Sequence, residues 1–194
     1  MASNSWAFVT RPCPDDNYSP ILQFQRVITM IAVNMNQTFP TGVDLSAASR
    51  EQLIAVLNQQ LADTFDLYSQ TKQAHWNVKG AQFIALHELF DKLAEELETY
   101  VDLIAERATA LGGLALGTAR MAGENSRLPE CVLDVTDSQP TVEALAERYA
   151  ALAASTRSAI ETAEAQHDAG TADLLTEVSR GLDKSRWFLE AHLQ

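Results

Sequence analysis

One stretch decides the fold of this chain: residues 75–106, which read HWNVKGAQFIALHELFDKLAEELETYVDLIAE. Gly80 divides the stretch, and apolar residues recur at helical spacing on both sides of it. The pattern predicts one helix over residues 49–77 and a second over residues 82–111. Because the link between them is short, the two helices are expected to form an antiparallel hairpin.

The ends of this hairpin carry recognisable signals. Ser49 followed by Gln52 resembles a capping box that starts the first helix. The segment 77–80 supplies its stop, and Gly112 with Gly113 ends the second helix. His75 is therefore expected in the last turn of the first helix.

Four candidate metal ligands share one face of the second helix. With His87 placed at zero and about 100° per residue, Asp91 falls near 40°, Asp102 near 60° and Glu106 near 100°. At about 1.5 Å of rise per residue, however, Asp91 and Asp102 are roughly 16 Å apart along the axis. Ligand atoms lie only about 2 Å from a metal ion. The helix therefore offers two half-sites, His87/Asp91 and Asp102/Glu106.

A second copy of the chain can complete both half-sites. If the same helix packs antiparallel across a two-fold axis, each His87/Asp91 pair faces the Asp102/Glu106 pair of the other copy. Such an isologous dimer is the commonest symmetric assembly. His75, on the neighbouring helix, is expected to complete each of the two sites.

The rest of the chain predicts an all-α protein, a four-helix bundle. Residues 112–140 form a long crossover, with a short helix near 117–122, which lets the second and third helices run parallel. A third helix is predicted to about His167, capped by Thr141 and ended by Gly170, and Thr171 caps a fourth. The expected inward-facing residues of these two helices are Val142, Leu145, Tyr149, Leu152, Thr156, Ile160, Leu174, Leu175, Val178, Leu182, Trp187 and Leu189.

Composition limits the class of protein. The 194 residues suit one domain, assigned to residues 46–194, with residues 1–45 as an N-terminal extension. The net charge of −12 repels nucleic acid and attracts cations, although many acidic proteins are acidic only for solubility. Two cysteines without ligand spacing suit a reducing compartment. Neither a secretory signal nor a membrane span is expected, so the predicted location is the cytoplasm.

Each candidate ligand alone is weak evidence for a metal site, because most single helical His and Asp residues are ordinary core or surface residues. The joint pattern, with two i,i+4 pairs on one face, is harder to dismiss. Imidazole with carboxylates suits iron, manganese or zinc. HELFD at residues 87–91 lacks the second His of a zinc protease. A single Glu164/His167 pair is also too little for a di-iron bundle that repeats this motif, and His192 is expected on the surface.

Three runs resemble one family, the Dps mini-ferritins, DNA-binding proteins from starved cells. They are LNQQLADTFDLYSQTKQAHWNVKG, FIALHELFDKLAEELETYVDLIAERATALGG and TADLLTEVSRGLDKSRWFLEAHL. The resemblance covers about residues 50–194. The spacings of five residues match the ferroxidase ligands of the family position by position: His75, His87, Asp91, Asp102 and Glu106.

The resemblance implies a ferritin-like bundle that assembles into a hollow homododecamer. It implies a ferroxidase site at each two-fold interface, with His75, His87 and Asp91 from one chain and Asp102 and Glu106 from its partner. The implied reaction oxidises ferrous iron, with hydrogen peroxide preferred to dioxygen, and stores ferric oxide, which protects against oxidative stress. Zinc is a possible competing ion.

Five further residues take their expected roles from the resemblance. Trp76 matches a tryptophan proposed to absorb stray oxidising equivalents, although plain interface packing is an equal alternative. Lys72 is expected to support the ligands. Asp168, Asp173 and Glu177 match acidic residues of the family's three-fold pores, where they would concentrate ferrous ions. For Asp173, a favourable charge near a helix N-terminus is a simpler interpretation.

Two alternatives to an iron-oxidising enzyme stay open. One is a DNA-compacting protein in which iron oxidation is secondary, but DNA-binding members generally use a Lys-rich tail and residues 1–45 hold no lysine. The other is a shell that holds zinc or manganese and turns over slowly.

Overall fold

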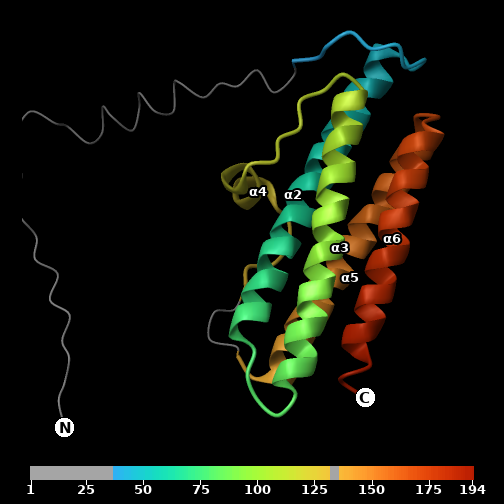
Figure 1. Cartoon of the computed structure of the whole chain (residues 1–194). Helices are drawn as coiled ribbons and strands as arrows, with labels where there is room; N and C mark the ends of the chain where they lie inside the picture. The colour runs from blue at the N-terminus through green and yellow to red at the C-terminus, as the bar shows by residue number, and fades with distance from the viewer. Residues whose placement is uncertain (1–36, 132–135) are drawn as a thin grey trace, which may run out of the picture. The chain divides into compact units, whose positions relative to one another are not determined.

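Helices make up nearly all regular structure in the computed structural model, which describes residues 37–131 and 136–194 (Figure 1). Within these ranges the only β interaction is an isolated bridge between Lys79 and Asp137. The helices are α2 (Ala47–Asn77), α3 (Phe83–Ala110), α4 (Ala119–Asn125), α5 (Ser138–Ala165) and α6 (Ala169–Glu190). The all-α prediction is confirmed. The expectations for residues 1–36 lie outside the described ranges.

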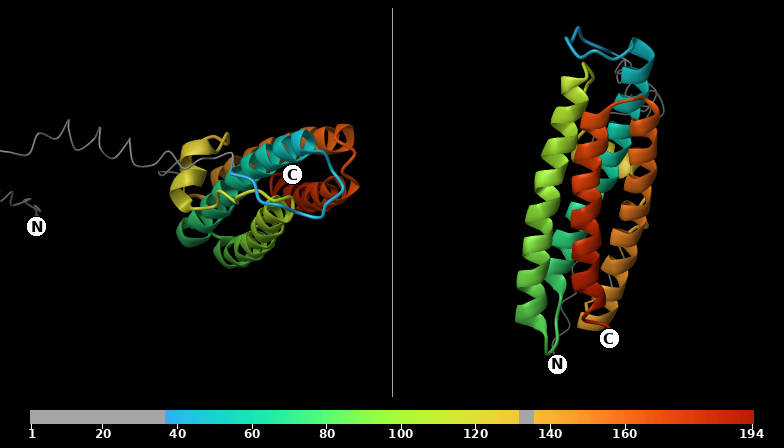
Figure 2. Two further views of the ribbon diagram at one scale, coloured as in Figure 1. Left: turned by 90° about the horizontal axis from the view of Figure 1, so that it is seen from above. Right: turned by 90° about the vertical axis from the view of Figure 1, so that its right-hand side faces the viewer.

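The four long helices form the predicted bundle with one long crossover. α2 and α3 are antiparallel neighbours, as are α5 and α6 (Figures 1 and 2). From the end of α3 the chain returns along α2, carrying α4, to the opposite end of the bundle, so α5 runs parallel to α3. α4 packs against α2. The predicted short helix exists, two residues later than expected.

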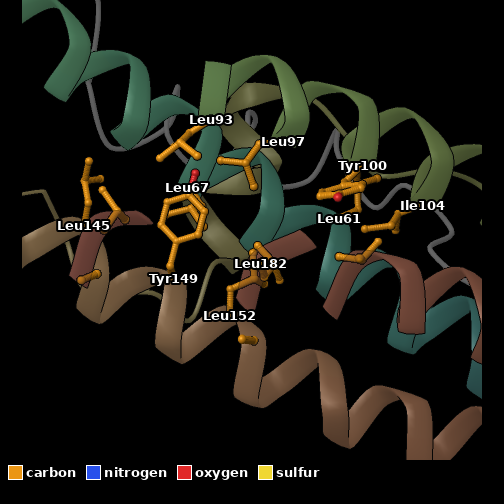
Figure 3. Close-up of a cluster of buried hydrophobic side chains, with 14 of the residues drawn as sticks. Leu61, Leu67, Leu93, Leu97, Tyr100, Ile104, Leu145, Tyr149, Leu152 and Leu182 are labelled. Atoms are coloured by element: carbon orange, nitrogen blue, oxygen red, sulfur yellow. The ribbon is translucent and has the colours of Figure 1, made fainter. Parts of the chain in front are cut away.

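The core lies between the four long helices. Figure 3 shows leucines of α2, α3, α5 and α6 around the ring of Tyr149, which is 1% exposed. Most of the predicted inward residues of α5 and α6 are buried. Trp187 is an exception, because 61% of it is exposed, and its assignment to the core is wrong. No helix within residues 37–131 and 136–194 has the length and hydropathy to cross a membrane.

Three predicted helix starts are wrong for one reason. The N-cap of α2 is Ser46, whose hydroxyl oxygen accepts the amide N–H of Ser49 at 3.0 Å. α5 starts after Asp137, and the Thr141 hydroxyl donates back to the Asp137 carbonyl at 2.7 Å. α6 starts after Asp168, which accepts the amide of Thr171 at 3.1 Å. Each expected cap lies inside the first turn and bonds to the true cap.

The chain reversals at the two ends of α3 depend on glycine, and the one after α5 does not. Gly80 has φ 106° in the turn before α3, and Gly112 has φ 86° just after it. A Cβ at Gly112 would overlap the Phe39 carbonyl oxygen. Gly170, the predicted end of the third helix, lies in the first turn of α6. The reversal is made instead by His167, with φ 58°.

Buried polar contacts fasten the crossover to α2. The Asp63 side chain is 1% exposed, and its carboxylate accepts three hydrogen bonds from Arg127, at 2.6, 2.8 and 3.0 Å. Arg148 of α5 donates to the Gln70 amide oxygen at 2.6 Å and also to the Glu130 carbonyl. These contacts satisfy groups that would otherwise be buried without partners.

Candidate metal centre

The hairpin between α2 and α3 brings two histidines into direct contact. The rings of His75 and His87 stack with their centroids 3.8 Å apart and their planes 20° from parallel. Nδ1 of His75 lies 2.8 Å from the His87 carbonyl oxygen, and Nδ1 of His87 lies 2.9 Å from the His75 carbonyl oxygen. A carbonyl only accepts, so each Nδ1 carries the proton. In the neutral rings both Nε2 atoms are therefore free to bind a metal ion.

Asp91 lies one turn after His87 and approaches the ring of His75. Its Oδ1 is 3.8 Å from Nε2 of His75 and accepts a hydrogen bond from Nζ of Lys72 at 2.6 Å. The Lys72 ammonium, mainly through this hydrogen bond, lowers the pKa of Asp91 below its ordinary value. The carboxylate is thus ionised at neutral pH and is paired with the Lys72 ammonium. Lys72 thus lies beside one of the expected ligands, and its supporting role stays a prediction.

Asp102 and Glu106 form a separate pair further along α3. Both side chains are exposed, and neither carboxylate has a hydrogen-bond or ion-pair partner within the described ranges. At about 1.5 Å of rise per residue, Asp102 is roughly 16 Å from Asp91 along the helix. Among the described residues, no three His, Cys, Asp or Glu side chains gather closely enough to hold a metal ion. The described residues of one copy therefore keep the five predicted ligands in two separate groups, with His75, His87 and Asp91 in one and Asp102 and Glu106 in the other; their role as half-sites stays a prediction.

Three large apolar side chains close in sequence to the two histidines are exposed. Trp76 is 65% exposed, Ile84 62% and Phe83 39%. The Phe83 ring is 5.2 Å from the His87 ring, and Lys72 Nζ is 6.0 Å from the Trp76 ring centroid. This apolar rim, defined as Trp76, Phe83 and Ile84, is the kind of exposed patch that proteins use for association. The role of Trp76 toward oxidising equivalents stays a prediction.

The three residues expected at a pore do not share one environment. Asp173 and Glu177 are exposed, one turn apart on α6. Asp168 is 5% exposed, and Arg107 donates to both of its oxygens, at 2.7 and 2.8 Å. Burial acts to raise the pKa of Asp168, but the hydrogen bonds from Arg107 and Thr171 outweigh it, and the pKa lies below its ordinary value. Asp168 thus joins the end of α3 to the start of α6.

Two side-chain pairs in the structure could not be predicted from the sequence. Arg107 follows Glu106 directly, yet its partner Asp168 is 61 residues away. Tyr100 and Glu96 on α3 are joined by a hydrogen bond of 3.0 Å inside the bundle. The i,i+4 spacing of Glu96 and Tyr100 permits such a contact but does not single it out. Glu164 and His167 are both exposed and belong to no metal-binding group of the described residues.

Comparison with known proteins gives consistent results. The family model described as a ferritin-like domain matches residues 54–194. The "DNA protection during starvation protein" of Agrobacterium fabrum is 44% identical over 158 residues, which cover 81% of this chain and 98% of that protein. "DNA protection during starvation protein 2" of Bacillus anthracis is 37% identical over 143 residues, covering 74% and 97%.

Solved structures show the same fold. DpsA14 from Streptomyces coelicolor superposes with a TM-score of 0.78 at 32% identity, over 81% of this chain and 94% of that one. The Dps protein of Vibrio cholerae O1, described as a member of a broad superfamily of ferritin-like diiron-carboxylate proteins, gives a TM-score of 0.75 at 25% identity, over 80% and 98%.

Proposed function

Because the chain belongs to the Dps family of ferritin-like proteins, we propose that it is a ferroxidase that stores iron. The substrates are ferrous iron and hydrogen peroxide, and the product is ferric oxide held inside a homododecameric shell. One observation carries the proposal: His75 of α2 and His87 of α3 stack with Asp91 beside them, while Asp102 and Glu106 lie exposed farther along α3. The ligand types, imidazole and carboxylate, suit iron.

The active site is proposed to form between two copies. In an antiparallel pair, His75, His87 and Asp91 of one copy face Asp102 and Glu106 of the other. The exposed apolar rim beside the histidines is available for this contact, which removes apolar surface from water. Each dimer then has two equivalent sites, and neither exists in a free subunit.

The histidines and the carboxylates are proposed to have different roles at this site. Nε2 of His75 and of His87 binds ferrous iron as a neutral donor, and the backbone carbonyls hold the rings in the required tautomer. The carboxylates of Asp91, Asp102 and Glu106 add negative charge, which stabilises the ferric product more than the ferrous substrate. One peroxide molecule accepts two electrons, one from each of two ferrous ions, so ferrous iron and peroxide are consumed without releasing a free radical.

A loss-of-function test removes the carboxylate half-site. We expect the double variant Asp102→Ala/Glu106→Ala to lose peroxide-driven oxidation of added ferrous iron while remaining assembled, as sized by light scattering. Glu161→Ala/Glu164→Ala is the matched control, since it removes two exposed carboxylates from α5. Oxidation at the wild-type rate by the first variant would overturn the assignment of the site.

Complementation tests whether the site is shared. His87→Ala/Asp91→Ala subunits and Asp102→Ala/Glu106→Ala subunits are expected to be inactive alone. When the two are co-expressed, half of the dimers are mixed and each mixed dimer has one intact site, so about a quarter of the wild-type activity should return. A site built within one chain would give no recovery.

The metal must also be identified, because zinc and manganese accept the same ligands. Metal analysis of the purified shell, before and after iron loading, separates an iron-storing enzyme from a shell that holds zinc or manganese without turnover. Zinc is expected to compete with ferrous iron and to slow the oxidation.

A further inference from the structure

A phenol and a carboxylate are paired where α3 packs against α6. Tyr100 is 7% exposed and lies in the core cluster shown in Figure 3. Its hydroxyl donates to Oε1 of Glu96 at 3.0 Å, and the Ser185 hydroxyl of α6 donates to Oε2 of Glu96 at 2.7 Å. Both carboxylate oxygens are therefore held in place, and one of them is aimed at the phenol.

The space for the phenol comes from a missing side chain. A Cβ at Gly181 of α6 would overlap the Tyr100 hydroxyl oxygen and would lie 3.1 Å from Oε1 of Glu96. Glycine in the interior of a helix costs about 1 kcal/mol relative to alanine. The helix thus accepts a less favourable residue at the one point where the phenol meets its carboxylate.

This pair lies on the same helix as the proposed ferroxidase half-site. Tyr100 precedes Asp102 by two residues, so the phenol and the Asp102 carboxylate point to opposite sides of a helix that is about 10–12 Å across. We propose that Tyr100 is a redox-active residue that gives one electron to oxidants formed at the iron site, while Glu96 takes its proton. This inference rests on the proposed iron oxidation.

The electrons and protons balance with reactants already named. When a single ferrous ion reduces peroxide, the products are a ferric ion, hydroxide and a hydroxyl radical. The hydroxyl radical takes an electron from Tyr100 and becomes hydroxide, and the phenolic O–H bond breaks as its proton moves to Glu96. The result is a neutral tyrosyl radical. A second ferrous ion then reduces this radical, and the proton returns from Glu96 to the phenol.

Glu96 is the feature that distinguishes this tyrosine from others. An oxidised phenol is strongly acidic, so electron loss is easier when a base is already hydrogen-bonded to the hydroxyl. Tyr149 is also buried, at 1% exposure, but its hydroxyl has no carboxylate hydrogen-bond partner within the described ranges. Tyr149 therefore serves as the matched control for Tyr100.

The test is to look for the radical by freeze-quench electron paramagnetic resonance. Assembled protein that holds less than one ferrous ion per site is mixed anaerobically with an excess of peroxide, so that few sites hold the second ion that would reduce the radical. We expect a neutral tyrosyl signal in wild type and in Tyr149→Phe, and its loss in Tyr100→Phe. Glu96→Gln keeps a hydrogen-bond acceptor but not a base, so it should lower the radical yield without changing the initial rate of iron oxidation. A purely structural role for Glu96 predicts no such effect.

An iron-free experiment separates this inference from the proposed function. Photogenerated ruthenium(III) tris-bipyridine oxidises the protein without iron, and Tyr100→Phe should yield less tyrosyl radical than Tyr149→Phe. If wild type does not oxidise iron, the proposed function fails and the iron-free yields alone decide the role of Tyr100. Equal tyrosyl yields from Tyr100→Phe and wild type in both experiments would overturn the inference.

Discussion

Replacing Lys72 by methionine tests how the histidine half-site is kept ready for iron. Nζ of Lys72 lies 2.6 Å from Oδ1 of Asp91, an oxygen that the proposed site needs for metal binding. A ferrous ion must therefore break this ion pair before it binds there. The Lys72→Met variant keeps the aliphatic stem and removes only the competing cation.

The size of the effect follows from exposure. The side chains of Lys72 and Asp91 are 22% and 45% exposed, so the pair is well solvated and, like other exposed ion pairs, is weak. Removing the pair should therefore tighten metal binding only a few-fold at neutral pH. The gain should shrink as salt screens the pair in the wild type.

The same variant has a defined pH dependence. Lys72 lowers the pKa of Asp91, so loss of the ammonium lets this pKa rise toward its ordinary value. At pH 7 the carboxylate remains ionised in both proteins, and the affinity gain is complete. As the pH falls toward the ordinary Asp pKa of about 3.9, the variant carboxylate is protonated first and the ratio of the two affinities falls.

Calorimetric titration with cobalt(II), which is not oxidised under these conditions, measures the affinity without turnover. Lys92→Met is the matched control, because Lys92 is exposed, adjacent to Asp91 in sequence and without an ion-pair partner in the described ranges. If Lys72→Met binds cobalt more weakly than wild type, Lys72 orients the ligand instead of competing with the metal, and the reasoning fails.

Three other substitutions test contacts that hold the bundle together. Arg127→Ala removes the guanidinium from the Asp63 carboxylate, which is 1% exposed, and should cost about 1–3 kcal/mol in denaturant unfolding, more than the double variant Asp63→Ala/Arg127→Ala. The pKa of Asp168 is lowered by folding, so its stabilisation is complete above the ordinary Asp pKa of about 3.9 and is lost as the pH falls through the folded value. The melting temperature of wild type should therefore fall more steeply in acid than that of Asp168→Asn. Gly181→Ala should cost about 1–3 kcal/mol through overpacking, and Tyr100→Phe, which removes the overlapping oxygen, should restore part of it.

The helices could be predicted because one face of each is apolar with a period of 3.6 residues. Their first residues could not, because a hydroxyl inside the first turn looks like a cap in sequence. Ser49, Thr141 and Thr171 are each three or four residues beyond the true cap and hydrogen-bond to it. Which of several neighbouring Ser, Thr and Asp residues is the N-cap depends on where the backbone leaves helical geometry. The residue types alone do not show where that is.

Trp187 shows a second limit of prediction from the sequence. Its size and apolar ring favour the core, and the sequence prediction followed that identity. Its position argues otherwise, because it lies about 140° around α6 from Leu182 and about 160° from Leu189, which are 1% and 0% exposed. The angular position of Trp187 on the helix, unlike its residue type, would have predicted that it is exposed.

The ion pairs were beyond prediction for a different reason. Arg127 meets Asp63 across 64 residues, and Arg107 meets Asp168 across 61. No local pattern selects one carboxylate out of 26 acidic residues for each arginine. These pairs follow from the crossover and from the packing of α3 against α6, so they become visible only when the whole bundle is assembled.

The two half-sites differ in how much of their geometry a single subunit determines. His75 and His87 hold each other through reciprocal bonds from Nδ1 to a carbonyl, so the short hairpin alone fixes the direction of both Nε2 atoms. Asp102 and Glu106 project into solvent with no partner inside the described part of their own chain. At the proposed site a first ion would therefore meet a prearranged pair of imidazoles, whereas the carboxylates would gain a fixed position only against a second copy. Association should then raise metal affinity mainly through Asp102 and Glu106, which is why the carboxylate variant, and not the histidine variant, isolates the contribution of assembly.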